Sequence, residues 1–240
     1  MAARDRRARA KPLHISYEAF RTAADEAACC GGTAGEGPTT LAVLIARGMT
    51  STQPAAMLEA VLGGQEGSPV HGVWHHALVG EILLVCLRNA GYPIGGELID
   101  EVVDRGRQIP GGACGFLGSC GALVSAASAY AVLLGSTPVA TGPWEQVLAF
   151  SQHLLARLTG IGGSRCCKKS SYVALELAQQ EFAKVGFALP REQFTGRCPF
   201  FRDNETCDGA ECPFFPQPAS MPDRPAEDAL GVRHGTGGDP

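Results

Sequence analysis

Apolar residues repeat every three or four positions through most of the chain. Between residues 70 and 90 this spacing predicts a long helix, which ends at the Gly-Tyr-Pro stretch beginning at Gly91. Residues 119–134 are small and apolar on nearly every side, as expected of a buried helix. Further helices are predicted over residues 14–29, 39–48, 53–62, 97–108, 143–159 and 170–185. No segment alternates like a strand, so the pattern predicts an all-α fold, a single multi-helix domain with cysteine-bearing loops at helix N-termini.

Composition marks the limits of this domain. Residues 1–13 are a short basic stretch that predicts a disordered tail. Residues 216–240 are rich in proline, glycine and charge, which predicts a second disordered tail. The helical domain is therefore expected over residues 14–215. Of the 240 residues 45% are hydrophobic, so the chain can build a core without disulfide bonds.

The charge balance narrows the range of partners. The formal net charge is −4, which argues against nucleic acid, because binding phosphates requires a basic face. No signal peptide is apparent, and no run of about 18 apolar residues predicts a membrane span. We therefore expect a cytoplasmic protein that acts on a small-molecule substrate or sulfur donor, with no nucleic acid or membrane partner. The sequence does not indicate an oligomeric state.

Seven of the ten cysteines fall in three short clusters: Cys114 and Cys120, Cys166 and Cys167, and Cys198, Cys207 and Cys212. Cysteines of a hydrophobic core are not gathered in this way. Loops between helices can bring thiolates together, as a metal ion, an iron–sulfur cluster or a redox thiol site requires. In a reducing cytoplasm such clusters indicate metal binding or catalysis rather than a disulfide framework.

The first two clusters share one design, in which a Gly-Gly break is followed by cysteines and then by a new helix. The partial positive charge of a helix N-terminus stabilises a thiolate, and we expect it to lower the thiol pKa. Arg165 and Lys168 add positive charge, so both are candidate catalytic residues. Cys114 and Cys120 are the candidate nucleophiles or persulfide carriers. The alternative is that the glycines allow tight turns and the cysteines are merely small.

The third cluster repeats the sequence Cys-Pro-Phe-Phe at Cys198 and Cys212, with Cys207 between the two copies. A proline after a cysteine recurs in iron–sulfur ligand runs, and phenylalanines would shield a cluster from water. Three thiolates are one short of a full set, and either Cys166 or Cys167 could supply the fourth. The favoured cofactor is an iron–sulfur cluster, most simply 4Fe-4S. Zinc, an open fourth position and a purely structural metal remain alternatives.

Three histidines stand within six residues, at His71, His75 and His76. His71 and His75 are four apart and share one face of the predicted helix, which is good metal-ligand geometry. They could instead be buried imidazoles that orient a substrate or move a proton. The third alternative is a helix start packed against Trp74.

Four motifs occur in order: H-G-x-x-H-H at residues 71–76, P-G-G-x-C-G-F-x-G-x-C-G at 110–121, G-G-x-R-C-C-K at 162–168 and C-P-F-F at 212–215. In these motifs the chain resembles an uncharacterised family of cysteine-rich proteins from methanogens and anaerobic bacteria that carries a domain of unknown function. Ser164 and Lys169 depart from the proline and arginine of the family pattern, but neither change removes a ligand. The resemblance implies a shared cytosolic function at these motifs and names no reaction. The methyltransferase label sometimes given to the family finds no support, because no strand followed by G-x-G-x-x-G occurs here.

Three hypotheses about function follow. The first is an iron–sulfur-dependent enzyme that transfers sulfur or performs thiol redox chemistry on a small molecule. The second is a zinc or mononuclear-metal enzyme that uses His71 and His75. The third is a non-catalytic carrier of a metal or a cluster.

Overall fold

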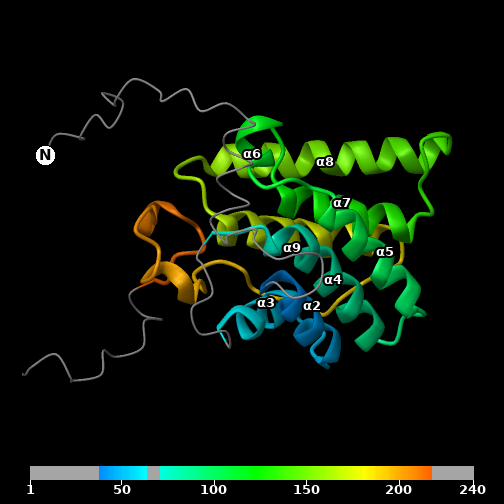
Figure 1. Ribbon diagram of the computed structural model, residues 1–240, viewed down its shortest axis with the longest axis horizontal. Coiled ribbons are helices and arrows are strands. Elements are labelled where there is room, and N and C mark those ends of the chain that lie inside the picture. Colours follow the sequence, from blue (N-terminus) through cyan, green and yellow to red (C-terminus); the bar gives the residue numbers. More distant parts are fainter. Residues whose placement is uncertain (1–37, 64–70, 218–240) are drawn as a thin grey trace, which may run out of the picture.

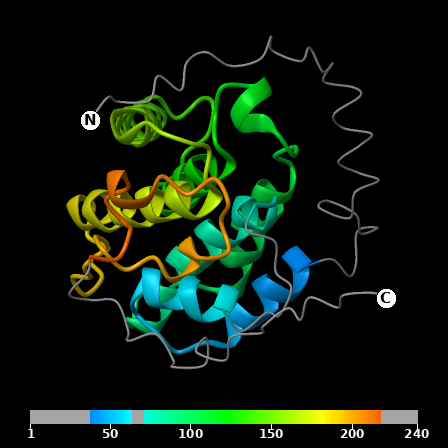
Figure 2. The ribbon, with the colours of Figure 1, turned by 90° about the vertical axis from the view of Figure 1, so that its left-hand side faces the viewer.

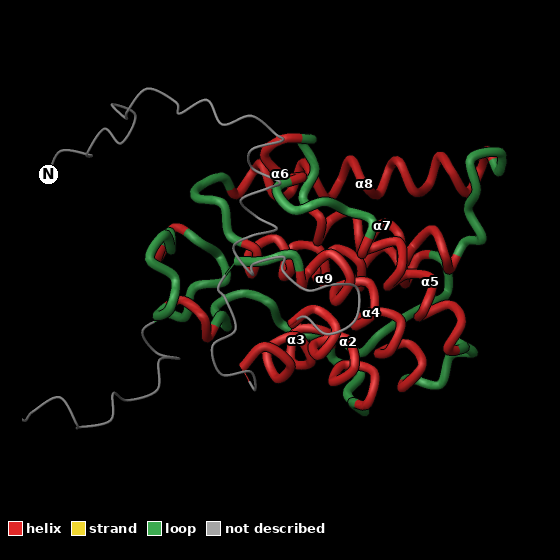
Figure 3. The backbone as a smooth tube through the Cα atoms, viewed as in Figure 1, coloured by secondary structure: helices red, strands yellow, loops and turns green. Residues whose placement is uncertain are grey.

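The computed structural model describes residues 38–63 and 71–217 (Figure 1). The helix predicted over residues 14–29 and the tail predicted over 1–13 lie outside this range, as does all but the start of the tail predicted over 216–240. The described residues form eight α-helices: α2 (Pro38–Gly48), α3 (Pro54–Gly63), α4 (Trp74–Asn89), α5 (Gly96–Arg107), α6 (Ala113–Phe116), α7 (Gly121–Leu133), α8 (Thr141–Ile161) and α9 (Cys167–Lys184). They contain no strand, which confirms the all-α prediction for this part of the chain (Figure 3).

Most helix bounds follow the apolar spacing to within about three residues, but α6 was not predicted. This helix has four residues, fewer than a periodic pattern needs to be visible. It follows Gly112, which has φ of 75°, a left-handed conformation that glycine adopts at little cost. Cys114 lies within α6, directly after this turn.

Helix α4 lies at the centre of the domain, with α2, α3, α5, α7 and α9 packed around it (Figure 1). Every residue from Trp74 to Leu87 is buried. Two glycines allow its neighbours to approach closely. A Cβ on Gly106 of α5 would collide with the backbone of His76, and a Cβ on Gly80 would lie 2.9 Å from the carbonyl oxygen of Ser125 on α7. The N-terminal turn of α4, with its histidines, is thereby fixed between α5 and α7.

The described chain beyond α9, up to residue 217, forms a long segment whose only helices are two short 3-10 helices, η1 (Pro199–Phe201) and η2 (Gly209–Glu211). The later part of this segment, which contains η1 and η2 and is orange in Figure 2, lies at the end of the domain where α9 begins. It closes on itself, because Cys198 N donates to Phe214 O at 2.8 Å. Phe214 is buried in the core and stacks on Tyr172 of α9, with ring centroids 5.1 Å apart. The two Cys-Pro-Phe-Phe repeats are thus held side by side against α9.

No helix among the described residues combines the length and the apolar character needed to cross a membrane.

Candidate functional site: two thiol-lined cavities at the start of helix α9

The turn between α8 and α9 places the second cysteine cluster. Gly162 and Gly163 both have positive φ, and a Cβ on Gly163 would collide with the Asp208 carboxylate. Cys166 is the N-cap residue of α9, and its Sγ accepts a hydrogen bond from the backbone N–H of Lys169 at 3.5 Å. The two adjacent cysteines have different surroundings, because Cys166 lines both of the cavities described below and Cys167 lines only the second.

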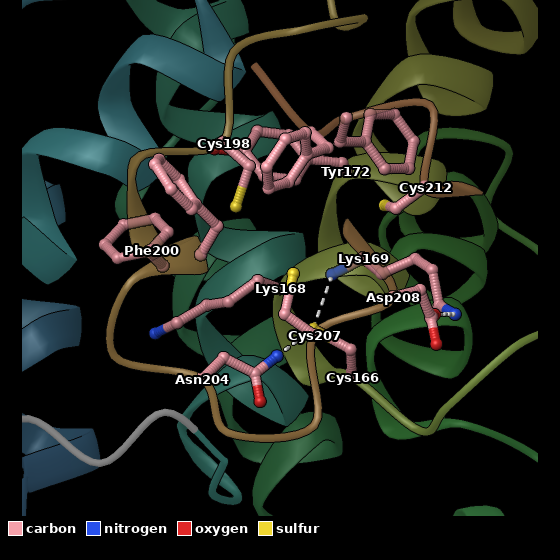
Figure 4. A pocket seen from close by; sticks show the side chains of 13 residues that line it. Cys166, Lys168, Lys169, Tyr172, Cys198, Phe200, Asn204, Cys207, Asp208 and Cys212 are labelled. Atoms are coloured by element: carbon pink, nitrogen blue, oxygen red, sulfur yellow. Dashed lines mark hydrogen bonds and ion pairs between the residues drawn. The ribbon is translucent and has the colours of Figure 1, made fainter. Parts of the chain in front are cut away.

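The first cavity is lined by four cysteines: Cys166, Cys198, Cys207 and Cys212 (Figure 4). Cys166 comes from α9 and the other three come from the C-terminal segment, and Figure 4 shows the four side chains arranged around a common space. The cavity volume is about 20 Å³, which is room for one water-sized particle. The described residues contain no group of three or more histidine, cysteine, aspartate or glutamate side chains already placed to hold a metal ion.

Aromatic rings and a buried lysine form one wall of the first cavity. The Nζ of Lys168 lies 4.2 Å from the ring centroid of Trp74 and 4.5 Å from that of Phe200. Burial lowers the pKa of Lys168 to about 8, although nearby thiols oppose this shift. A cation held between two aromatic faces gains cation–π stabilisation. The Lys168 charge is also close enough to Cys166, Cys167 and Cys198 to interact electrostatically with their thiols.

Hydrogen-bond donors also point at the sulfur atoms. Asn204 Nδ2 donates to Cys166 Sγ at 3.7 Å, in addition to the backbone donor from α9. The backbone N–H of Gly209 donates to Cys207 Sγ at 3.5 Å. Burial raises the pKa of Cys198 to about 12. Without a ligand this thiol is protonated, and binding a metal would release its proton.

The second cavity has a volume of about 280 Å³ and adjoins the first. It brings the first two cysteine clusters together, since Cys114, Cys120, Cys166 and Cys167 all line it. His75 is part of the same wall. The remaining sides come from the end of α8 and from the turn that leads into α9.

A histidine and a cysteine lie close together in the second cavity. Cys120 is the N-cap residue of α7, and its Sγ lies 4.0 Å from His75 Nε2. Burial and the neighbouring His76 bring the pKa of His75 well below its ordinary value. Burial likewise raises the pKa of Cys120, although a hydrogen bond with Ser170 opposes this shift. At neutral pH the pair is therefore a neutral thiol beside a neutral imidazole.

The expectation that helix N-termini lower the thiol pKa was wrong for two cysteines. The pKa of Cys120 is raised, and that of Cys167 is raised to about 11. The physical reason is desolvation, which disfavours the thiolate and outweighs the backbone N–H groups. For Cys167 it also outweighs the Arg165 guanidinium, whose Nη1 donates to Cys167 Sγ at 3.7 Å.

The predicted site residues fall into separate groups. Cys198, Cys207 and Cys212 meet Cys166 in the first cavity, whereas Cys167 does not line it. Neither His71 nor His76 lines either thiol cavity. His76 Nδ1 donates to the carbonyl oxygen of Ile109 at 3.0 Å, and its ring covers Gly121, where a Cβ would collide with it.

Sequence reasoning missed several residues that shape the site. The Asp208 carboxylate accepts hydrogen bonds from Ser164 N at 2.8 Å and from Lys169 Nζ at 2.9 Å. Asn204 and Ser170 contact the cysteines directly. Asp208 directly follows Cys207, and an acidic neighbour of a candidate ligand is a signal that could have been used. Asn204 and Ser170 give no local signal, because their partners are distant in the sequence.

The comparison with known proteins now defines the class of the chain. It belongs to a family of unknown function (DUF5714), whose model matches residues 43–215. The match covers both thiol cavities and all four histidine and cysteine motifs. No curated protein and no solved structure matches the chain.

Proposed function

We propose that this protein is an iron–sulfur enzyme whose cluster is held by Cys166, Cys198, Cys207 and Cys212. The observation that carries the proposal is that these four thiols, from two parts of the chain, line one cavity. Four cysteine thiolates are the usual ligand set of a 4Fe-4S cluster. The described cysteines are all free, which suits the reducing cytoplasm in which we expect the protein to work.

The surroundings of the four thiols support this assignment. Phe200 and Phe214 line the first cavity and would limit the access of water to a cluster. The buried charge of Lys168 and the N–H donors to Cys166 would offset the negative charge of four thiolates. Because the cavity volume is only about 20 Å³, the sulfur atoms must move apart when a cluster is loaded.

The neighbouring second cavity is the proposed place of the small-molecule substrate. A bound cluster would supply redox chemistry at the wall that the two cavities share, where Cys166 lies. Cys120 offers a thiol, and His75 Nε2, 4.0 Å away, can accept its proton. Thiol redox chemistry or sulfur transfer is the reaction class that suits these groups.

A zinc site is the second candidate, favoured by the small volume of the first cavity. Around one zinc ion the Zn–S distance of about 2.3 Å would draw the four sulfur atoms together. The same four cysteines would then hold the ion, and because four thiolates leave no open position on zinc, its role would be structural.

Metal analysis tests the proposal. We expect protein purified without oxygen to be brown, with iron, acid-labile sulfide and broad absorption near about 400 nm, the region of thiolate–iron charge transfer. Cys198→Ser and Cys212→Ser should each lose this absorption. Cys86→Ala is the matched control, because Cys86 is buried in the core and lines neither thiol cavity. Colourless protein with stoichiometric zinc would favour the second candidate, and protein that takes up neither metal would refute both.

A further inference from the structure

The second cavity contains a positive charge that the described residues do not neutralise. Arg165 is exposed at this cavity and forms no ion pair with a described carboxylate. Its hydrogen bond among the described residues is the long one to Cys167 Sγ, at 3.7 Å. Lys169 also lines the cavity, but its Nζ is already paired with Asp208 at 2.9 Å. Arg165 is therefore the cation available to a ligand, and the nearby N-terminus of α9 adds to the positive potential.

The inner wall of the second cavity contains His75 and Cys120, which are buried and uncharged, in contrast to the exposed Arg165. The His75 side chain is 4% exposed, and its Nδ1 has no hydrogen-bond partner of normal geometry among the described residues. Its Nε2 is the atom that lies 4.0 Å from Cys120 Sγ. A buried imidazole beside a thiol can take up the thiol proton as the sulfur reacts. The cavity thus combines a cation at its exposed side with a proton acceptor and a nucleophile inside.

We infer that the second cavity binds a small, thiol-reactive organic anion, whose acid group pairs with Arg165 and whose electrophilic atom faces Cys120. This inference rests on the proposed use of the second cavity as the substrate site, and it adds the chemical class of the substrate. A volume of about 280 Å³ limits the ligand to a small molecule.

The reaction at Cys120 is a substitution that needs no external oxidant. The Cys120 sulfur forms a bond to the electrophilic carbon or sulfur of the ligand. The bond from that atom to the leaving group breaks, and the leaving group departs with the electron pair. The thiol proton passes to His75 Nε2, which lies 4.0 Å from Cys120 Sγ.

Two alkylating reagents that differ only in charge test the inference. Iodoacetate is an anion and iodoacetamide is neutral, and both replace iodide by the cysteine sulfur. The rate of modification at Cys120 is measured for each reagent on the full-length protein, with the site resolved by tandem mass spectrometry. We expect the iodoacetate-to-iodoacetamide rate ratio at Cys120 to fall about threefold to fivefold in Arg165→Gln, as for the loss of one partly exposed ion pair. Arg165→Lys should retain most of the ratio.

Lys184→Gln is the matched control, because it changes the net charge by the same amount. Lys184 is at the opposite end of α9, about 25 Å along the helix from its start. The ratio at Cys120 should equal that of the wild type in this variant. An equal fall in Lys184→Gln would show a general charge effect and would overturn the inference.

Two further results would also overturn it: a ratio that Arg165→Gln leaves unchanged, or a Cys120 that neither reagent modifies in the native protein. The reagents act whether or not a metal is bound. Protein that lacks iron but keeps the Arg165 dependence would refute the proposed cluster and leave the anion site standing. Protein that holds the cluster but whose rate ratio does not depend on Arg165 would refute the anion site and leave the proposed cluster standing.

Discussion

Arg197 and Glu59 form a bidentate ion pair that attaches the C-terminal segment to helix α3. Arg197 Nε lies 2.6 Å from Glu59 Oε1, and Nη2 lies 2.9 Å from Glu59 Oε2. Tyr172 OH donates to the same carboxylate at 2.7 Å. The third guanidinium nitrogen binds Glu192, whose carboxylate accepts the backbone N–H groups at the start of α3. Since Arg197 directly precedes Cys198, this ion pair fixes one corner of the first cavity.

The first prediction is that Arg197→Met destabilises the protein and impairs metal uptake together. The pair is partly buried, so we expect a loss of about 2 kcal/mol in the free energy of unfolding, between the values of exposed and buried pairs. Urea denaturation and metal content measure the two effects. Arg191→Met is the control, because Arg191 is exposed on the same segment and forms no ion pair with a described carboxylate. Normal metal uptake by Arg197→Met would show that the ion pair does not position Cys198.

The second prediction concerns Glu81, which is fully buried on α4 and pairs with Arg47 at 3.0 Å. Burial raises the pKa of Glu81 from 4.5 to about 7, although Arg47 and Arg107 oppose the shift and Asp100 adds to it. The folded state therefore binds more protons than the unfolded state between these two pH values. The stability that Glu81 contributes is fully present below about pH 4.5 and is lost as the pH rises through 7.

Glu81→Gln tests whether the stability contributed by Glu81 falls as the pH rises. The variant removes the titration and keeps a hydrogen-bond acceptor for Arg47. From pH 5 to pH 8 the wild type should lose up to about 3 kcal/mol relative to the variant, given 1.36 kcal/mol for each pKa unit. Thermal or urea unfolding across this range measures the difference. A constant difference between the two proteins would mean that Glu81 titrates normally.

The third prediction concerns the contact between His76 and Gly121. Gly121→Ala puts a methyl group into the His76 ring, and overpacking of this kind costs about 1–3 kcal/mol. Because Gly121 directly follows Cys120, the variant should also slow the modification of Cys120 by iodoacetamide. Gly115→Ala is the matched control, since a Cβ there meets no described atom within 4 Å. Equal stability of the two variants would contradict the close contact.

Much of this arrangement could be predicted from the sequence, because it depends on local patterns. Apolar spacing predicted most of the helices, and the Gly-Gly breaks correctly placed Cys120 and Cys166 at helix starts. The separation of Cys166 from Cys167 could not be predicted. It depends on how α9 packs between the C-terminal segment and α7, which adjacent residues in a sequence do not reveal.

The thiol pKa values were mispredicted for a related reason. A helix N-terminus can be recognised from the sequence, but the burial of Cys120 and Cys167 is a tertiary property. The ion pairs that fix the C-terminal segment also join distant parts of the chain, since Arg197 and Glu59 are 138 positions apart in the sequence. No local pattern identifies such pairs.

The fourth prediction is that Lys168 costs stability and assists cofactor binding. Lys168 is 3% exposed and forms no ion pair with a described carboxylate, so its charge is desolvated, and the Trp74 and Phe200 rings lie against it. Lys168→Met keeps a similar length and volume without the charge. We expect the metal-free variant to unfold a few degrees above the metal-free wild type. The loaded variant should hold its iron more weakly, because four thiolates lose a nearby cation.

Calorimetry of the metal-free proteins measures the effect on stability, and iron retention against a chelator measures the effect on cofactor binding. Lys168→Arg is the companion variant, because it keeps the charge and should retain iron better than Lys168→Met. Lys184→Met serves as the control for loss of a lysine, since Lys184 is exposed and lies at the far end of α9. If Lys168→Met lowers the unfolding temperature of the metal-free protein, the cation–π contacts outweigh desolvation and Lys168 is a structural residue. If the variant gains stability but retains iron as well as the wild type, the charge has no role at the four thiols.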